Sequence, residues 1–428
     1  MGNRYKKLLL LKSIGVPAGA ARVVAIMKAQ WRALTRPTIL RRLSSSSQPA
    51  AVMHGALDVR LGATPDVSSA AASDDGVLLA VEAVGICGSD LHYYRDGGIG
   101  SATIASSGNG RFVPGHEFSA RLVEDVAGLG ARGDRVAVDP ARPCGRCEWC
   151  ARAQVNLCPS VHFTGAPPVG GAMTPLVRVA AAQCYRVPAA FSATTTMMLE
   201  PLGVALHAVK LADLARRVET KGALPPLHAS PIESLAVLGV GTIGLLTLQL
   251  ARLELGPTRT IMAVDPIAAR RAAALRLGAD LAFATVDELL EAQLKRDWKP
   301  HADGAENNTT RSGVDYVFEA TNDAEGLNDA ARACAIGASI VAIGIPDGGA
   351  YAPADAAELR RKAITTRWSR RMGDVMLEAI ALVERGAIDV ESLVTHRVAL
   401  GEDVAHAFAR AEAYEEGCIK TVVDITTS

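Results

Sequence analysis

The sequence has few aromatic residues, no net charge and no long apolar run. Aromatic residues make up 4% of the 428 positions, and 45 Lys and Arg balance 45 Asp and Glu. A neutral balance argues against a dedicated nucleic-acid-binding protein, which usually carries a basic face. The leucine run at residues 8–11 is much shorter than the roughly 20 residues of a membrane span. With 49% hydrophobic residues, the composition is that of an ordinary globular protein of two or three domains.

The first 57 residues contain no Asp or Glu. Lysines and arginines recur through this segment, and the serine run Ser44–Ser47 follows them. A segment rich in Arg and Ser and poor in acid is typical of an organelle transit peptide. We therefore predict a basic leader over residues 1–50, with a basic amphipathic helix at Met27–Leu43 and a mitochondrial destination favoured over a plastid. A disordered basic tail, or translation from an internal methionine, is the alternative.

Half of the eight cysteines lie within one stretch of fifteen residues. They follow the pattern C-x2-C-x2-C-x7-C and are Cys144, Cys147, Cys150 and Cys158. Tetrahedral zinc needs four ligands that converge on one point, and closely spaced thiolates on a loop provide them. Such short gaps are poor for disulfides within the cluster. The pattern predicts a structural zinc site, and a reduced loop without metal is the alternative.

A second set of zinc-ligand types lies upstream of this loop. Cys87 ends a β-rich segment, and His116 and Glu117 are adjacent in the sequence. A catalytic zinc ion has three protein ligands and an open position, and thiolate, imidazole and carboxylate all qualify as ligands. The spacing alone does not show that the three side chains converge. Glu200 begins an apolar helix, where a carboxylate needs either a capping role or a nearby metal. We expect His207, on the same helix, to be packed rather than ligating.

The segment that starts near residue 234 has the pattern of a dinucleotide-binding unit. A strand leads into Gly239, Gly241 and Gly244, which form G-x-G-x-x-G, and a helix follows. The glycines allow a tight turn, close approach of a pyrophosphate, and packing of the helix on the strand. The helix N-terminus, at Thr242 and Ile243, faces the phosphates. A second strand then ends at Asp265, at the spacing expected for the acid that binds the ribose hydroxyls.

Asp265 also predicts the choice of coenzyme. A carboxylate at this position accepts hydrogen bonds from the 2′-hydroxyl of NAD and would repel the 2′-phosphate of NADP. Arg270 and Arg271 follow on the next helix, and either could reach the coenzyme or belong to a solvated helix face. We predict NAD as the coenzyme, with Arg270 among the residues that contact it.

Apolar strands and helices continue to alternate through the rest of this region. Six short strands separated by helices predict a doubly wound parallel sheet, the last strand lying near Trp368. The polar segments 216–230 and 301–312 are expected to be a linker and a surface insertion. The chain is then predicted to end with two helices and a closing strand.

Together these motifs resemble the zinc-containing medium-chain dehydrogenase/reductase superfamily. The stretches that carry the resemblance are GICGSDLHYYRDGGIG, VPGHEFSA, the cysteine loop, LEPLGVALHAV, GVGTIG, VDYVFEAT, SLVTHRVAL and GCIKTVV. Within the superfamily, the chain is most similar to the polyol dehydrogenases that act on sorbitol, xylitol or L-idonate. The resemblance implies an α/β fold: a GroES-like β-barrel catalytic domain over residues 51–202 with both zinc sites, an inserted Rossmann NAD-binding domain over 203–366, and a return to the catalytic domain over 367–428.

The resemblance also implies roles for individual residues. Cys87, His116 and Glu117 match the ligands of the catalytic zinc, with Glu200 beside the metal as a ligand or through water. Ser89 and His92 match a proton relay, and Tyr93 and Arg367 match positions that line the substrate pocket. The implied reaction is hydride transfer from a secondary alcohol of a polyol or sugar acid to NAD, which gives a ketose or keto acid.

Substrate choice stays open at this point, because the family's Phe-Arg-Tyr triplet is Thr366-Arg367-Trp368 here. A dehydrogenase for another secondary alcohol, of the threonine or butanediol type, is the alternative, and a non-enzymatic zinc-bearing binding protein is a remote one. The expected partners are a small-molecule substrate and further copies of the chain in a dimer or tetramer. No nucleic acid is expected as a partner, and no membrane for the mature form.

Overall fold

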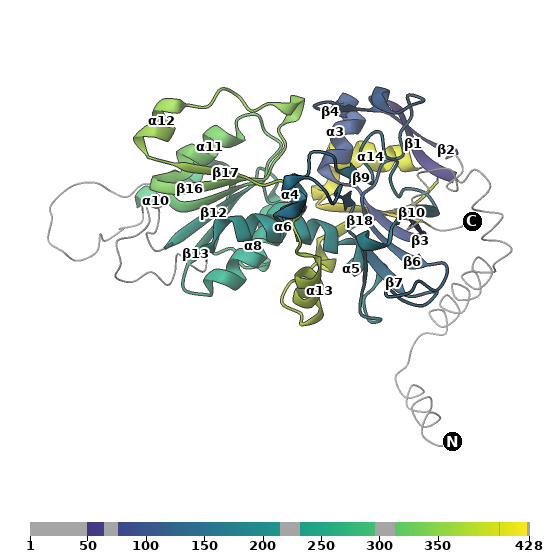
Figure 1. Ribbon diagram of the computed structural model, residues 1–428. Coiled ribbons are helices and arrows are strands. Elements are labelled where there is room, and N and C mark those ends of the chain that lie inside the picture. The colour runs from purple at the N-terminus through teal and green to yellow at the C-terminus, as the bar shows by residue number, and fades with distance from the viewer. Residues whose placement is uncertain (1–48, 64–75, 215–231, 296–312, 402, 426–428) are drawn as a thin grey trace, which may run out of the picture.

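A computed structural model describes residues 49–63, 76–214, 232–295, 313–401 and 403–425. The chain forms two lobes, one built on a mainly antiparallel sheet and one on a parallel sheet (Figure 1). The predicted linker and surface insertion lie outside the described residues, as does the predicted leader except for residues 49 and 50, which begin strand β1 (Pro49–Gly55). Within the described part, no helix has both the length and the apolar character needed to cross a membrane.

The first lobe is built around a seven-stranded sheet in the order β11-β7-β6-β3-β19-β18, with β10 also paired to β3. Its strands are β3 (Gly76–Gly85), β6 (Glu117–Leu122), β7 (Arg135–Val138), β10 (Leu176–Ala180), β11 (Cys184–Arg186), β18 (Val394–Ala399) and β19 (Lys420–Asp424). The central strands are almost fully buried, and the cluster of buried residues on them forms the core of this lobe. The last strand of the chain, β19, therefore lies between β3 and β18, beside the first strands of the sheet.

Shorter elements surround this sheet. They are β1 (Pro49–Gly55), β2 (Asp58–Ala63), β4 (Gly98–Ile99), β5 (Ala102–Thr103), β8 (Ala141–Arg142), β9 (His162–Phe163), α3 (Gly88–Asp96), α4 (Glu148–Ala151), α5 (Ala193–Met197), α13 (Met376–Glu384) and α14 (Val404–Glu412). The sequence predicted two helices and a closing strand for the last segment. The structure adds β18. Half-buried and exposed residues alternate along this strand, so its sequence contains no apolar run that would predict it.

The second lobe has a six-stranded parallel sheet in the order β14-β13-β12-β15-β16-β17. Its elements are β12 (Ser234–Leu238), α8 (Thr242–Leu255), β13 (Thr260–Val264), α9 (Ala268–Arg276), β14 (Leu281–Phe283), α10 (Val286–Lys295), β15 (Val314–Glu319), α11 (Gly326–Ala333), β16 (Cys334–Ala342), α12 (Ala356–Arg361) and β17 (Thr365–Trp368). This is the predicted doubly wound arrangement. The strand order reverses beside β12, and such a switch point is where open parallel sheets bind ligands.

Helix α6 (Leu199–Ala212) joins the two lobes, and Figure 1 shows it between the two sheets. Most of its residues are buried, which explains why its sequence is apolar on most faces. One continuous core cluster includes Leu202 of α6, Leu246 of α8 and Met376 of α13. Each fully buried leucine of this kind contributes roughly 1.5–3 kcal/mol through removal of its surface from water. The predicted domain limits at 202 and 366 fall inside α6 and β17, and remain predictions.

Candidate functional site

The glycine turn between β12 and α8 has the close packing that its sequence predicts. Gly239 has φ +76°, and a Cβ on Gly244 would lie 1.9 Å from the carbonyl oxygen of Gly239. Gly241 differs, because a Cβ there would meet nothing nearer than the Arg270 guanidinium at 3.7 Å. Open space therefore remains directly before the N-terminus of α8, where free N–H groups favour an anion. This turn fits a dinucleotide pyrophosphate.

Asp265 lies at the end of β13, next to this turn. Its carboxylate accepts hydrogen bonds from the backbone N–H of Val240 at 3.0 Å and of Ile267 at 2.8 Å. Arg270 Nη1 is 3.9 Å from the carboxylate, but its guanidinium donates to the carbonyl of Cys418 and lies over the Tyr414 ring at 4.4 Å. The arginine is thus tied to the C-terminal segment. Thr242 also contacts that segment, because its hydroxyl donates to the Ile419 carbonyl at 2.8 Å, and Ile243 is half-buried in the first turn of α8.

Cys87, His116 and Glu117 come together in the first lobe. Cys87 precedes α3, at the end of β3, and the other two residues lead into β6, which pairs with β3. One potential ligand atom from each residue lies within 4.8 Å of the others. Among the described residues, the buried Nδ1 of His116 has no hydrogen-bond partner, and Oδ1 of Asp90 lies 3.7 Å from it. A sulfur, an imidazole and a carboxylate at this separation are a donor set that suits zinc.

Lys420 on β19 is a member of this cluster that the sequence analysis missed. Its Nζ lies 2.9 and 2.6 Å from the two oxygens of Glu117 and 3.0 Å from the carbonyl of Ile86. The side chains of the pair are 3% and 1% exposed. A Cβ on Gly85 would lie 2.2 Å from Oε2 of Glu117, so this glycine makes room for the carboxylate. Lys420 therefore balances the charge of Glu117 and donates to both of its oxygens, each of which keeps a second lone pair.

Asp90 is the second residue that the sequence analysis missed. Its fully buried carboxylate accepts hydrogen bonds from the backbone N–H of Cys87 at 3.0 Å and of Gly115 at 3.2 Å. Each of these groups adjoins a predicted zinc ligand, so Asp90 fixes the backbone on both sides of the site. An acid in the first turn of a helix, three residues after Cys87, was the available signal.

Glu200 lies in the first turn of α6 and is buried. It does not belong to the three-residue ligand group found among the described residues. Burial raises the pKa of Glu200 to about 8; His116 opposes this shift and Glu117 adds to it. The carboxyl is thus close enough to feel both groups, and whether it binds a metal directly or through water stays a prediction.

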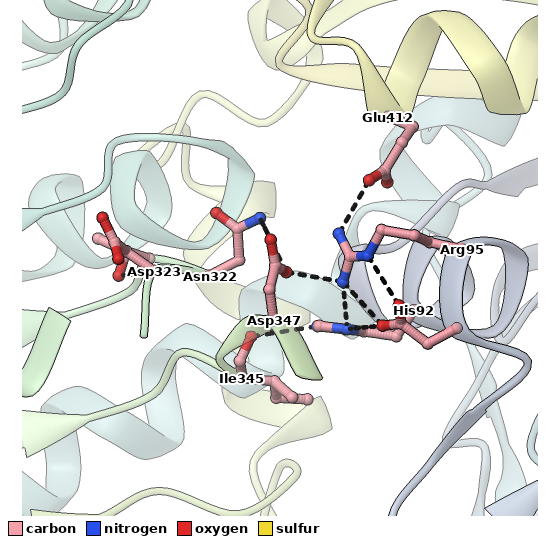
Figure 2. Close-up of polar contacts among 9 residues, drawn as sticks. His92, Arg95, Asn322, Asp323, Ile345, Asp347 and Glu412 are labelled. Carbon is pink, nitrogen blue, oxygen red and sulfur yellow. Dashed lines mark hydrogen bonds and ion pairs between the residues drawn. The ribbon is translucent and has the colours of Figure 1, made fainter. Parts of the chain in front are cut away.

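The predicted relay residues lie on α3. Ser89 is half-buried and His92 is buried. The ring of His92 contacts Arg95 through Nδ1 and the carbonyl of Ile345, which follows β16 in the second lobe, through Nε2 (Figure 2). His92 therefore lies where the first lobe touches the second.

The two predicted pocket residues are placed differently. Tyr93 is buried against Phe112, and burial together with Asp90 raises the pKa of its hydroxyl to about 12. Arg367 lies on the edge strand β17, and its guanidinium donates to the carbonyl of Leu211 at the end of α6. The neighbouring Trp368 is 59% exposed and packs against Tyr351. The structure thus engages Arg367 with a helix end, and its role at a substrate stays a prediction.

The four-cysteine loop has the geometry of a tetrahedral site. One sulfur from each of Cys144, Cys147, Cys150 and Cys158 lies within 4.8 Å of the others, and all four thiols are free. Zinc–sulfur bonds of about 2.3 Å imply sulfur atoms roughly 3.8 Å apart in a tetrahedron. The sulfur atoms of the loop, which include a pair 3.4 Å apart and lie no more than 4.8 Å from one another, are therefore close to the spacing that zinc needs. Backbone N–H groups of Arg146 and Cys147 lower the pKa of Cys144 to about 6, which favours the thiolate that a metal needs.

Asn156, inside the cysteine loop, connects the loop to other parts of the chain. Its side-chain amide donates to the carbonyl of Arg370 at 3.2 Å and lies 3.3 Å from Nε2 of His207 on α6. Its carbonyl accepts a hydrogen bond from Arg371 at 3.2 Å. Arg370 and Arg371 follow β17, where the chain returns to the first lobe. The loop thus braces the crossing between the lobes. His207 is half-buried in this contact, and its not being a metal ligand stays a prediction.

Comparison with known families gives two matches along the chain. Residues 73–189 match the alcohol dehydrogenase GroES-like domain, and residues 242–385 match the zinc-binding dehydrogenase family. The first range covers Cys87, His116, Glu117 and the cysteine loop. The second begins at α8 and includes the C-terminal ends of β13, β15 and β16.

Individual proteins agree with these matches. The chain is 28% identical to a sorbitol dehydrogenase of Bacillus subtilis over 87% of this chain and 96% of that protein. It is 30% identical to sorbitol dehydrogenase 1 of Saccharomyces cerevisiae over 89% of this chain and 99% of that protein. Among solved structures, a Sinorhizobium meliloti protein described as a zinc-binding dehydrogenase with NADP bound is similar, with TM-score 0.69 and 25% identity over 89% of this chain and all of the other.

Proposed function

The chain belongs to the family of zinc-binding alcohol dehydrogenases with a GroES-like domain, and from that premise we propose that it oxidises a secondary alcohol of a polyol or sugar acid with NAD. It is an enzyme, with zinc and a nicotinamide dinucleotide as its cofactors. The observation that carries the proposal is the convergence of Cys87, His116 and Glu117 at the end of β3. That segment runs directly into α3, which touches the second lobe at Ile345. The similarity to two sorbitol dehydrogenases supports the substrate class.

In this proposal the residues of the chain divide the work between the two lobes. Cys87, His116 and Glu117 hold zinc, and a zinc ion there supplies Lewis acidity toward the oxygen of the alcohol. Glu200 lies beside this set and Lys420 balances Glu117. Ser89 and His92 move the hydroxyl proton away from the site, since histidine changes charge in the useful pH range.

The second lobe positions the coenzyme. The turn at Gly239–Gly244 holds the pyrophosphate against the N-terminus of α8, and Asp265 binds the ribose. Packing of the lobes on each other excludes water from the reacting groups and strengthens their electrostatic interactions. Tyr93 and Arg367 are proposed to line the pocket, Arg367 after release from Leu211.

NAD is proposed rather than NADP because of the groups around Asp265. A buried carboxylate at this position repels a 2′-phosphate. Arg270 is engaged by Cys418 and Tyr414, and Arg271 donates to the main-chain carbonyl of Asp265 at 2.7 Å. The NADP-bound relative from Sinorhizobium meliloti makes this a point to test. A ratio of kcat/KM for NADP over NAD above one would reject the assignment.

A panel of alcohols tests the substrate class. Zinc-loaded protein is assayed by NADH absorbance with sorbitol, xylitol and L-idonate, and with threonine and 2,3-butanediol as the competing class. We expect the polyols and the sugar acid to give kcat/KM at least about tenfold above the other two, because hydroxyl-binding groups left unpaired by a smaller substrate weaken transition-state binding. Faster turnover of threonine or butanediol would replace the polyol assignment, and no turnover of any alcohol would favour a binding protein.

Two further proposals concern assembly and location. We propose that the chain forms a homodimer or homotetramer, supported by the exposed edge strand β17 with its exposed Trp368. A monomer mass in light scattering would reject this.

We also propose that the acid-free leader of residues 1–50 directs the protein to mitochondria. A fusion of this leader to a fluorescent protein tests it, and diffuse cytosolic fluorescence would contradict it.

A further inference from the structure

One arginine joins the two lobes beside the relay histidine. Arg95 lies in the last turn of α3, and its guanidinium reaches carboxylates on two other elements (Figure 2). Nη1 donates to Glu412 of α14 at 2.8 Å, and Nη2 donates to Asp347 of the second lobe at 2.7 Å. The side-chain amide of Asn322 lies 3.2 Å from each oxygen of Asp347 and holds this carboxylate in place. Arg95 and Asp347 therefore form an ion pair between the lobes.

The same guanidinium determines which nitrogen of His92 carries the hydrogen. Nη2 of Arg95 lies 2.9 Å from Nδ1 of His92. Arginine has no acceptor, so a hydrogen bond between these two nitrogens requires that Nδ1 accept it and carry no hydrogen. Nε2 lies 3.1 Å from the carbonyl oxygen of Ile345, which can only accept, so Nε2 carries the hydrogen. Both contacts require the same neutral tautomer.

Asp96 is the group that would favour the opposite tautomer. Its Oδ2 lies 3.4 Å from Nδ1 of His92, whereas Nη2 of Arg95 lies 2.9 Å from that oxygen and 2.9 Å from Nδ1. Nη2 of Arg95 stands between the two groups, and its two hydrogens are shared among three acceptors, Nδ1 of His92, Asp96 and Asp347. If the guanidinium moved away, Asp96 could accept a hydrogen from Nδ1. The other charged groups that face Arg95, Asp347 and Glu412, are both acceptors that hold it in place.

We propose that Arg95 is a positioning residue that fixes His92 in its Nε2–H tautomer, and that Asp347 makes this setting depend on contact between the lobes. The inference rests on the proposed function, in which His92 passes the hydroxyl proton outward. While the lobes touch, the hydrogen of the neutral ring is directed at the second lobe, and the unprotonated Nδ1 is the nitrogen that can take up a proton. When Asp347 moves away with its lobe, Arg95 loses the partner that holds it beside His92, and the Ile345 carbonyl that accepts from Nε2 leaves with the same lobe.

The solvent exposure of the Arg95–Asp347 ion pair distinguishes a positioning role for Arg95 from a role in stabilising the fold. The side chains of Arg95 and Asp347 are 25% and 46% exposed. Ion pairs with this much contact with water contribute little to stability, because solvent screens them. Removal of either side chain should therefore leave the fold intact but change the tautomer of His92.

The tautomer is read directly by NMR of full-length, zinc-loaded protein labelled with ¹⁵N-histidine, with His92→Gln used to assign the ring signals. We expect the wild type to show a hydrogen on Nε2 and none on Nδ1. In Arg95→Met the hydrogen should move at least partly to Nδ1, and Asp347→Ala should give a smaller change in the same direction. Arg332→Met is the matched control, because Arg332 pairs with Asp287 and Asp329 on the second lobe away from His92.

Kinetics of the same variants give a second readout. Arg95→Met should lower kcat about ten- to a hundredfold through misplacement of the relay, with the KM for NAD changed less than about twofold. A hydrogen on Nδ1 in the wild type, or His92 signals unchanged in Arg95→Met, would overturn the proposal. If Arg95→Met does not fold, unchanged signals in Asp347→Ala overturn it instead. The NMR result does not depend on the substrate, so failure of the polyol assignment would leave it intact.

Discussion

Replacement of Cys87 by serine should lower turnover at least about 1,000-fold while NADH binding stays within about twofold of the wild type. A serine hydroxyl is a far poorer zinc ligand than a thiolate, and loss of Lewis acidity removes several kcal/mol of transition-state stabilisation, at about 1.4 kcal/mol for each tenfold in rate. Coenzyme binding is kept because the glycine turn and Asp265 lie on the other lobe. Steady-state kinetics, NADH fluorescence and zinc content per chain measure the three quantities.

Cys147→Ser is the matched control, since it removes a thiol from the other cluster. It should lower the unfolding temperature and the yield of assembled protein, because the cysteine loop braces the crossing at Arg370 and Arg371 through Asn156. Turnover for each folded molecule should change much less than in Cys87→Ser. Activity that survives Cys87→Ser would remove that residue from the metal site, and a well-folded but inactive Cys147→Ser protein would contradict the division between the two clusters.

Replacement of Lys420 by methionine should destabilise the protein by about 3–5 kcal/mol. The variant leaves the carboxylate of Glu117 buried without its cation, and the cost of an unpaired buried charge exceeds that of a lost surface contact. Methionine keeps most of the volume of the lysine stem, so the effect of charge is separated from that of a cavity. Urea unfolding of zinc-free protein, in which no metal ion neutralises Glu117, gives the difference in free energy of unfolding from zinc-free wild type.

Replacement of Glu117 by a neutral residue should restore most of the stability that is lost in Lys420→Met. Glu117→Gln in the Lys420→Met background removes the buried charge, so the double variant should be more stable than Lys420→Met alone. Lys210→Met provides the surface control, because its ion pair with Glu378 is about half exposed and such pairs contribute roughly 0–1 kcal/mol. A Lys420→Met variant no less stable than this control would show that the buried pair does not matter for stability.

The parts of the site that were predictable from sequence are those encoded by short spacings. The glycine turn and Asp265 lie within one strand–helix–strand unit, and the cysteine loop spans fifteen residues, so local pattern was sufficient to place each on its element. The α/β class and the parallel second sheet followed from the alternation of apolar strands with helices, and both are confirmed. Cys87 and His116 were proposed together only because the flanking motifs resemble a family.

The contacts that were missed join residues far apart in the chain. Lys420 reaches Glu117 across 303 positions, and Arg95 reaches Asp347 across 252. The sequence around a lysine in a strand or an arginine in a helix does not indicate which residue it will contact. That partner is determined by how the sheets and lobes assemble. Arg367 illustrates the same limit, since its motif matched a pocket residue while the fold places its guanidinium on the end of α6.

The position of β19 has a consequence for biosynthesis. The ribosome delivers the chain from its N-terminus at about 5–20 residues per second, so Lys420 follows Glu117, 303 positions earlier, by about 15–60 s. Until then β3 lacks its neighbour β19, and Glu117 lacks its counterion. The second lobe, whose sheet strands all lie between Ser234 and Trp368, can be complete before the first. The lobe translated first is therefore the last to close, and Glu117 gains its counterion only after Lys420 has been made.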